Sequence, residues 1–265
     1  MRLDQLPTEI ITHIGNYLEN KKDFANTCRS CYLALLPQLW HHISLHDQQQ
    51  LSKIMYGCYV REVSLSEQPK GLPMSFEMGN PLKCSVESEK QEIDLIQFGK
   101  HLITLCPYIA CLEIDLDAYI FVQPYGMIEY RGELCLSNYR SETILLQLLP
   151  CFGYIPHLTV RTPTVISLCD DDIVLLSERD MLPIMALDEL ISLNLAYLDT
   201  DVSPETIYRL VKRLPHLRRL QLNWLFPPYQ HDHSRLCKLL EDGFGLCPDR
   251  IYSKSYFFQV CFTIT

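Results

Sequence analysis

Glycine is scarce in this chain, and so are the motifs that depend on it. Ten glycines occur in 265 residues, and none of them cluster. There is consequently no glycine-rich phosphate-binding loop, no G-x-G-x-x-G dinucleotide-binding turn and no G-x-S-x-G nucleophile elbow. The chain therefore lacks the common signatures of nucleotide-binding proteins and of serine hydrolases. We therefore expect a protein with no catalytic residues, no metal and no cofactor.

Long hydrophobic runs and an excess of positive charge are also absent. No apolar run approaches the roughly 20 residues of a membrane-spanning helix, and residues 1–5 lack the apolar stretch of a signal peptide. The 32 acidic residues outnumber the 23 basic ones and give a net charge of -9. A negative balance disfavours nucleic-acid binding. We expect a cytoplasmic or nuclear protein that binds neither membrane nor nucleic acid.

Cysteine, by contrast, is abundant, with twelve in the chain. Without a secretory signal these are expected to be reduced thiols, and several lie among apolar neighbours as small core residues. The C-x-x-C pair of Cys28 and Cys31 has no matching second pair, so no zinc site is expected. The His-Asp-His run at 231–233, near Cys237, is interpreted as a solvated loop that opens a helix. The three aspartates at 170–172 are interpreted as a turn and helix start, where the helix dipole favours carboxylates.

The first 45 residues have apolar positions at helical spacing. Ile10, Ile14 and Leu18 are four residues apart and form one stripe, which Ile11 and Tyr17 widen on its flanks. Three short helices are expected here, and they bury too little surface to be stable alone. They also carry more apolar surface than their own core hides. Either a partner protein or the rest of the chain must cover the remainder.

Local signals set the ends of these helices. Pro7 suits the first turn of the first helix, where its missing N–H costs nothing. Asp23 is expected to cap the second helix, and Pro37 is expected to break the third segment, which spans 32–40. Trp40, at the end of that segment, is a candidate for the internal core.

Taken in order, these residues resemble the F-box motif, which is matched by Leu6-Pro7-x-Glu9-Ile10-Ile11, Ile14, Tyr17-Leu18, Asp23, Cys28-Arg29 and Leu39-Trp40. The resemblance covers about a sixth of the chain. F-box proteins use this module to dock on the S-phase-kinase-associated adaptor of SCF-type ubiquitin ligases, and through that adaptor on a cullin. The resemblance implies that residues 1–45 form such a module. It also implies an adaptor contact through five residues: Leu6, Pro7, Ile10, Ile14 and Leu18.

A leucine phrase recurs in residues 46–265. Leu190-x-x-Leu193-x-Leu195 returns 27 residues later as Leu217-x-x-Leu220-x-Leu222. Weaker copies of the phrase start at Val60, Ile109 and Ile155. A unit of this length, with a strand at the leucines and a helix between them, is typical of leucine-rich repeats.

The helix between the two clear copies is expected over 201–214, capped by Ser203 and begun by Pro204. A last helix is expected around 236–240 and a last strand within 255–265. The spacing of the weaker copies is uneven, which we attribute to insertions near 66–100 and 121–142. The first insertion is interpreted as a loop, and the second as a hairpin or excursion.

The predicted fold is α/β, with a small N-terminal three-helix F-box module followed by an irregular leucine-rich-repeat-like solenoid of strands and helices. A compact α/β domain with a parallel sheet is the alternative. The two parts together resemble F-box proteins with degenerate leucine-rich repeats. That resemblance implies the substrate-recognition subunit of an SCF-type ubiquitin ligase, which holds an unknown protein target and performs no chemistry itself.

Strand geometry predicts which residues would hold the target. Side chains alternate along a strand, so the residues between the leucines point away from the core. The residues predicted to bind the target are Arg161, Asn194, Arg219, Gln221 and Asn223. The same face is expected to carry Cys111, Glu113, Asp115, His157, Thr159, Ser192 and Ala196.

Two other functions remain open from the sequence. One is a scaffold that binds the adaptor without ubiquitin transfer, which the turnover of a bound partner would separate from a receptor. The other is an unrecognised hydrolase or metal enzyme, which bound zinc or a pocket with convergent Cys, His and Asp side chains would favour.

Overall fold

The computed structural model describes most of the chain, and the segments it describes are residues 5–46, 48–66, 91–122, 126–139, 144–161, 175–198, 202–224, 230–246, 248–254 and 257–264. Two of the interpretations made from the sequence concern residues outside these segments. The turn proposed at 170–172 lies outside the described residues, and so does the part of the first expected insertion over 67–90.

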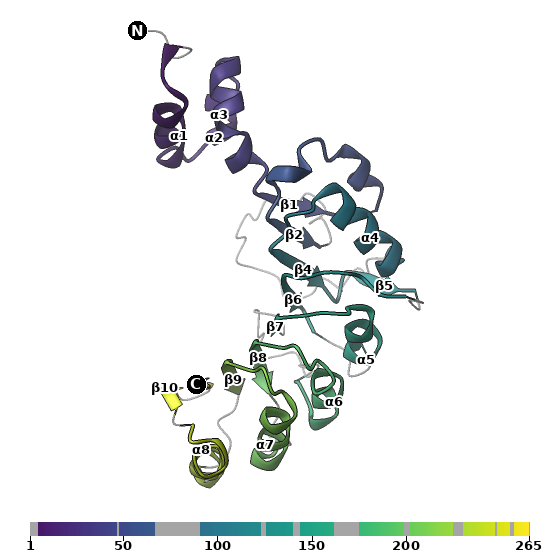
Figure 1. Cartoon of the computed structure of the whole chain (residues 1–265), viewed down its shortest axis with the longest axis vertical. Coiled ribbons are helices and arrows are strands. Elements are labelled where there is room, and N and C mark those ends of the chain that lie inside the picture. The colour runs from purple at the N-terminus through teal and green to yellow at the C-terminus, as the bar shows by residue number, and fades with distance from the viewer. Residues whose placement is uncertain are drawn as a thin grey trace, which may run out of the picture.

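Three helices form the N-terminal end of the molecule (Figure 1). They are α1 (Thr8–Asn16), α2 (Lys21–Ala25) and α3 (Arg29–Leu39). Pro7 directly precedes α1. Asn20 caps α2, because its side chain accepts a hydrogen bond from the backbone N–H of Asp23 at 3.3 Å. The expectation that Asp23 caps this helix is therefore wrong, since Asn20 supplies the acceptor before the first turn begins.

Pro37 lies inside α3, so the break expected there is absent. Proline removes one backbone donor, but the helix continues past it and ends where the Trp40 N–H donates to the Leu36 carbonyl at 3.0 Å. α3 packs closely on α1 at Gly15, where a Cβ atom would lie 2.3 Å from Leu35 Cδ2. The three helices share a small core of buried side chains: Ile11, Cys31 and Ala34.

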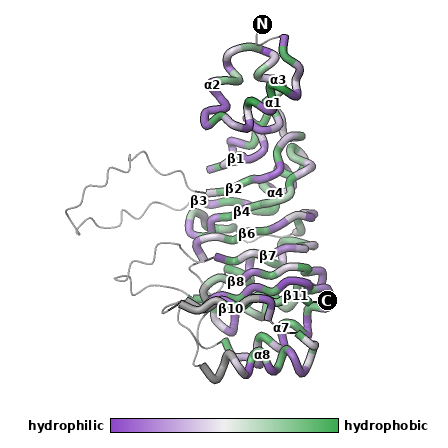
Figure 2. Tube along the Cα trace, turned by 90° about the vertical axis from the view of Figure 1, so that its left-hand side faces the viewer, coloured by the Kyte–Doolittle hydropathy of each residue, from purple (hydrophilic) through white to green (hydrophobic). Residues whose placement is uncertain are grey.

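The remainder of the described chain is built around a nine-stranded sheet. In spatial order its strands are β1 (His42–Leu45), β2 (Glu62–Leu65), β4 (Cys111–Asp115), β6 (Glu133–Ser137), β7 (His157–Val160), β8 (Ser192–Leu198), β9 (Arg219–Trp224), β11 (Phe257–Thr263) and β10 (Pro248–Lys254). Strands β1 to β9 of this sheet are parallel and follow one another in chain order down the long axis (Figure 2). β11 and β10 then pair antiparallel at the far edge. A separate parallel pair consists of β3 (Gln91–Ile93) and β5 (Tyr119–Phe121).

The connections between strands carry the helices. These are η2 (Gln48–Lys53), η3 (Gly57–Tyr59), α4 (Leu95–Leu105), α5 (Ile144–Leu148), η4 (Leu149–Cys151), η5 (Glu178–Asp180), α6 (Met181–Ile184), α7 (Pro204–Arg213) and α8 (Gln230–Phe244). Helices α4 to α7 lie along one face of the sheet (Figure 1). None of the described helices has the length and apolar character needed to span a membrane.

The ends of two helices test the sequence interpretation. α7 begins at Pro204 after Ser203, whose hydroxyl accepts a hydrogen bond from the Thr206 N–H at 3.2 Å, so this predicted start is confirmed. Residues 231–233, expected in a loop, instead lie within α8.

Two rows of apolar side chains cross the sheet on the face that the helices cover. One row is Ile43, Val63, Leu112, Leu134, Leu158, Leu193, Leu220 and Phe262, and the other is Leu45, Leu65, Ile114, Leu136, Val160, Leu195, Leu222 and Val260. Apart from the half-buried Ile43, all of them are buried. Burying a side chain of this size stabilises the fold by about 1.5–3 kcal/mol. The prediction that the leucines of the repeated phrase point into one core is confirmed.

β6 corrects the expectation that residues 121–142 leave the repeat as a hairpin or excursion. This strand lies between β4 and β7 in the large sheet, and its Leu134 and Leu136 are fully buried. The α/β class, with a large and mostly parallel sheet, is confirmed. The strand expected within 255–265 is also confirmed as β11, which β10 covers on its outer side.

Trp40 joins the helices to the sheet. Its side chain is partly buried against the large core under the sheet, and its ring packs edge-on against Tyr56 with 5.5 Å between centroids. The side chain therefore serves the internal core. The small core of α1 to α3 is separate from the large one, so this junction is one of the places where the two parts meet.

Candidate functional site

α1 presents an apolar face to solvent. Ile10 is 46% exposed and Tyr17 is 77% exposed, and Ile14 between them is half-buried. Spacings of four and three residues place these side chains on one side of the helix. Ile11, the next residue after Ile10, is only 1% exposed. The helix therefore hides one apolar stripe and leaves a second one in water. We call Pro7, Ile10, Ile14 and Tyr17 the α1 face.

The residues predicted to contact an adaptor differ in their burial. Pro7 and Ile10 are exposed, whereas Ile14 and Leu18 are half-buried. Leu6 is also half-buried, and it packs against the small core of α1 to α3. It therefore has a structural role, because replacing it disturbs the helices as well as their surface. Tyr17, which the sequence placed on the flank of this stripe, was not among the predicted adaptor contacts, although its position three residues after Ile14 puts it on the same face.

A second surface lies on the opposite side of the sheet from the apolar rows. The parallel register places Ser64, Glu113, Cys135, Thr159, Asn194 and Gln221 in one row. A neighbouring row includes Asp115 beside Ser137, and Asn223 beside Gln259. Because side chains alternate along each strand, these residues project away from the core. The face is polar from one end of the sheet to the other.

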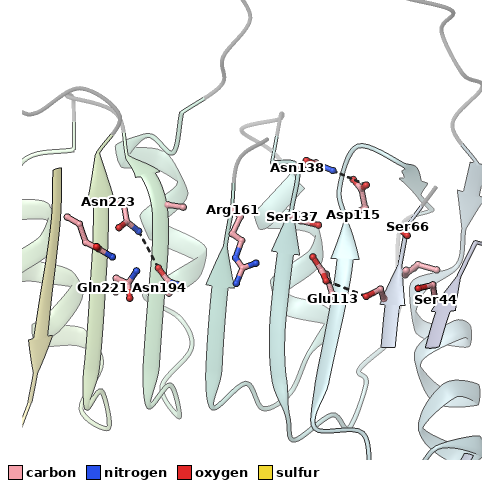
Figure 3. Close-up of a pocket in the computed structure, with 14 residues that line it drawn as sticks. Ser44, Ser66, Glu113, Asp115, Ser137, Asn138, Arg161, Asn194, Gln221 and Asn223 are labelled. Atoms are coloured by element: carbon pink, nitrogen blue, oxygen red, sulfur yellow. Dashed lines mark hydrogen bonds between the residues drawn. The ribbon is translucent and has the colours of Figure 1, made fainter. Parts of the chain in front are cut away.

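This polar face is hollowed, with a volume of about 660 Å³. We call the hollow the groove, and its lining residues are Ser44, Ser64, Leu65, Ser66, Glu113, Asp115, Ser137, Asn138, Arg161, Asn194, Ala196, Gln221, Asn223 and Gln259. Four of the predicted target-binding residues, Arg161, Asn194, Gln221 and Asn223, line it (Figure 3). Arg219 is exposed at the start of β9 and is not among the lining residues.

The groove also contains residues that the sequence did not indicate. Ser44, Ser137 and Gln259 belong to β1, β6 and β11, which the leucine phrase did not assign to this face. Asn138 follows β6 with a φ of 54°, in the left-handed region that asparagine tolerates better than most residues. Its side chain donates to Asp115 Oδ2 at 2.9 Å. No local sequence signal predicts that contact, because it depends on the neighbouring strand.

Hydrogen bonds between strands hold several of these side chains in place (Figure 3). Ser64 Oγ donates to Glu113 Oε2 at 3.3 Å. Asn223 Nδ2 donates to Asn194 Oδ1 at 3.4 Å and to the Leu195 carbonyl at 3.0 Å. Such contacts fix polar groups before any ligand arrives, which lowers the entropy lost on binding.

Two thiols on this face, those of Cys111 and Cys135, are poor nucleophiles. Burial raises the pKa of Cys135 to about 12, although the nearby Arg161 lowers it. Burial, together with the charges of nearby glutamates, raises the pKa of Cys111 to about 11. Thiolate is the reactive form of cysteine, so both side chains are protonated and unreactive near neutral pH. These two thiols are therefore not candidates for nucleophilic chemistry on the polar face.

The candidate metal ligands do not come together. Among the described residues, no group of three or more His, Cys, Asp or Glu side chains is placed to hold a metal ion. Cys28 and Cys31 have their sulfur atoms 3.4 Å apart, and Cys28 Sγ accepts a hydrogen bond from the Cys31 N–H at the start of α3. Cys28 therefore acts as the N-cap of α3.

No protein-family model matches this chain, and no curated protein matches it. A functional assignment consequently rests on the α1 face and the groove, together with the resemblance of the first 45 residues to the F-box motif.

Proposed function

We propose that this chain is the substrate-recognition subunit of an SCF-type ubiquitin ligase. The α1 face docks on the S-phase-kinase-associated adaptor, the adaptor binds a cullin, and the groove holds the protein target. The chain contributes no catalytic side chain. It accelerates ubiquitin transfer by holding the target close to the transfer enzyme, which raises the effective concentration of the reacting groups.

One observation carries the adaptor-binding half of this proposal. The large apolar residues that remain exposed on the α1 face, Ile10 and Tyr17, stand at positions where the chain resembles the F-box motif. A helix in a folded protein does not usually leave a stripe of this kind in water unless a partner covers it. Ile11, on the other side of the helix, already supplies the internal core.

The target-binding half is supported by the sheet. Its parallel strands succeed one another in chain order, and their buried positions repeat the leucine phrase. This arrangement favours a leucine-rich-repeat-like solenoid, in which each unit packs on its neighbours and the strands form one continuous binding surface. The polar groove on that surface is the place where a target fits.

Affinity purification tests the proposal. Tagged wild type is expected to recover the adaptor and a cullin, as identified by mass spectrometry. A variant with Pro7→Ala and Ile10→Ser is expected to lose both, because it removes exposed apolar contacts without touching the small core. Leu146→Ser is the matched control, since Leu146 is 50% exposed on α5, far along the chain from α1. Circular dichroism checks that the helices of each variant remain formed.

The outcomes separate the possible roles. If the wild type recovers no adaptor, or if the α1 variant recovers as much as the control, the adaptor-binding role is wrong. A different result would separate a scaffold from a receptor. If the wild type recovers the adaptor, but cells with the Pro7→Ala, Ile10→Ser variant degrade each bound partner as fast as cells with the wild type, the chain acts as a scaffold rather than as a receptor for degradation.

A further inference from the structure

Three charged side chains line the groove, and none of them is neutralised within the described residues. Glu113 accepts a hydrogen bond from Ser64, and Asp115 accepts one from the Asn138 side chain and one from the Asp117 backbone N–H, all of them uncharged donors. Among the described residues, the ion pairs involve other groups. Arg161 is exposed, and its guanidinium makes no hydrogen bond to a described residue. These charges are therefore available to a ligand.

The register fixes how far apart these charges lie. Asp115 pairs with Ser137, and Leu136 pairs with Val160, so the next residue, Arg161, lies beside Ser137. Asp115 and Arg161 are thus two strands apart in one row. Neighbouring strands lie about 4.8 Å apart, which gives roughly 10 Å between the two backbone positions. An extended chain rises about 3.3 Å per residue, so about three residues span this separation.

The other half of the groove is uncharged. Asn194, Gln221 and Asn223 stand beyond Arg161, on β8 and β9 (Figure 3). A primary amide offers both donors and an acceptor, which are the groups that match the N–H and C=O of a peptide backbone. The lining thus changes along the sheet from carboxylates to one guanidinium and then to amides.

We infer that the groove receives an extended, unphosphorylated peptide segment that carries one basic side chain over β4 and one carboxylate side chain over β7. The basic side chain pairs with Glu113 and Asp115, and the carboxylate pairs with Arg161. The two ligand side chains are about three residues apart along the segment. This inference deepens the proposed function, on which it rests for the identification of the segment as part of a target protein.

Charge balance favours a carboxylate over a phosphate at Arg161. The lining holds two carboxylates and one guanidinium, so its net charge is negative. A phosphorylated side chain carries about −1.5 to −2 charges at neutral pH. It would stand roughly 10 Å from Asp115 and be repelled by that carboxylate. The separation is close to the Debye length at physiological salt, so screening removes only part of the repulsion. A single arginine suffices for one carboxylate, which it binds through two parallel hydrogen bonds. Repulsion from the two carboxylates of the lining disfavours a nucleic acid as well.

Selection from a library of short random peptides displayed on phage tests this inference with the purified full chain. Peptides that bind are expected to carry Lys or Arg about three positions from Asp or Glu. Arg161→Gln and the double variant Glu113→Gln with Asp115→Asn should each bind the selected peptides about tenfold more weakly, equivalent to about 1.4 kcal/mol. Arg218→Gln is the control, because Arg218 is exposed outside the groove lining and should leave binding unchanged.

Two further measurements sharpen the test. A chain with Glu113→Gln, Asp115→Lys and Arg161→Glu is expected to select peptides in which the basic and acidic positions have exchanged places, because its charges over β4 and β7 are reversed. Replacing the acidic residue of a selected peptide with phosphoserine is expected to weaken its binding to the wild type.

Several results would overturn the inference: no peptide selected, selected peptides without a charge preference, equal binding to the charge-neutral variants, or tighter binding of the phosphoserine peptide. Its failure is distinguishable from failure of the proposed function. Peptide binding by a chain that recovers no adaptor would leave the groove assignment standing and contradict the receptor role. Recovery of the adaptor without peptide binding would leave the receptor role standing and contradict the groove assignment.

Discussion

Asp180 is fully buried and accepts hydrogen bonds on both carboxylate oxygens. Tyr139 donates its hydroxyl to Oδ1 at 2.7 Å, and Ser177 donates its backbone N–H and its hydroxyl to Oδ2 at 2.8 and 3.0 Å. These bonds tie the end of β6 to η5, which stands on the connection to β8. A buried carboxylate is tolerated because donors surround it.

Removing one donor should therefore be costly. Tyr139→Phe leaves Oδ1 of Asp180 without its partner, and we expect the free energy of unfolding to fall by about 1–3 kcal/mol. Urea denaturation measures the change. Tyr154→Phe is the control, because the half-buried Tyr154 makes no hydrogen bond through its hydroxyl to a described residue, and its effect should stay within about 0.5 kcal/mol. Equal losses for the two variants would contradict the account of this network.

The buried thiols give the protein a pH dependence on the alkaline side. Burial raises the pKa of Cys106, Cys135 and Cys151 above the ordinary value of 9.0, to between about 11 and about 12. In the unfolded chain these thiols lose their protons near pH 9, while in the folded protein they keep them. The unfolded state then binds fewer protons, so stability falls as pH rises through this range. Below pH 9 the contribution is fully present.

Urea unfolding at about pH 8 and about pH 10 measures this decline. Lysine and tyrosine residues also titrate at high pH, so the informative comparison is between variants. Cys135→Ala is expected to flatten the decline relative to the wild type. Cys58→Ala should change it much less, because Cys58 is exposed and its charge is only the lesser of the two causes that raise the pKa of Cys106. A decline that is the same in all three proteins would show that the Cys135 thiol is not responsible for part of it.

β6 marks the limit of what the leucine pattern predicts. The position three residues before Leu134 is Arg131, so the phrase L-x-x-L-x-L is incomplete there. The spacing of the leucines nevertheless indicates this strand, which the phrase did not predict. Leu112 and Leu158 are 46 residues apart, and Leu134 divides that stretch into two units of 22 and 24 residues, each within the range of a leucine-rich repeat.

Replacing a buried leucine of β6 tests whether the strand belongs to the core. Leu134→Ala is expected to lower the free energy of unfolding by about 2–5 kcal/mol, because it removes apolar contacts and leaves a cavity. Leu146→Ala is the matched control on the exposed side of α5, with an expected effect within about 0.5 kcal/mol. A small effect at Leu134 would mean that residues 121–142 lie outside the core after all.

Local signals predicted elements better than they predicted the groove. The start of α7 follows from Ser203 and Pro204, two neighbouring residues that act on their own backbone. Strand alternation likewise indicated that Asn194, Gln221 and Asn223 share a face. Arg219 lies outside the groove because it occupies the row nearest the strand starts, whereas the groove lies over the later residues of each strand. That offset depends on how nine strands are stacked, which no single segment encodes.

The described residues form two cores of very different size. The one beneath α1 to α3 consists of Ile11, Cys31 and Ala34 with a few partly buried neighbours, while the one beneath the sheet extends from β1 to β11. Trp40 packs against the larger core and links the helices to it. We therefore expect the helices to depend for their stability on the sheet, on the proposed adaptor, or on both.

We accordingly expect a peptide comprising residues 1–46 to be mostly unfolded by itself, because so small a core does not offset the entropy of ordering three helices. Circular dichroism should show weak helicity and no cooperative thermal transition. Addition of the adaptor should raise the helicity as the α1 face becomes covered. A sharp transition in the isolated peptide would show that the small core is sufficient.

The central claim is that the α1 face binds the adaptor, and titration calorimetry with the two purified proteins tests it most directly. The full chain is expected to bind the S-phase-kinase-associated adaptor with one-to-one stoichiometry. The Pro7→Ala, Ile10→Ser variant should bind at least tenfold more weakly, a loss of about 1.4 kcal/mol, while Leu146→Ser should bind as the wild type does. Absence of binding by the wild type, or equal binding by all three proteins, would contradict the claim.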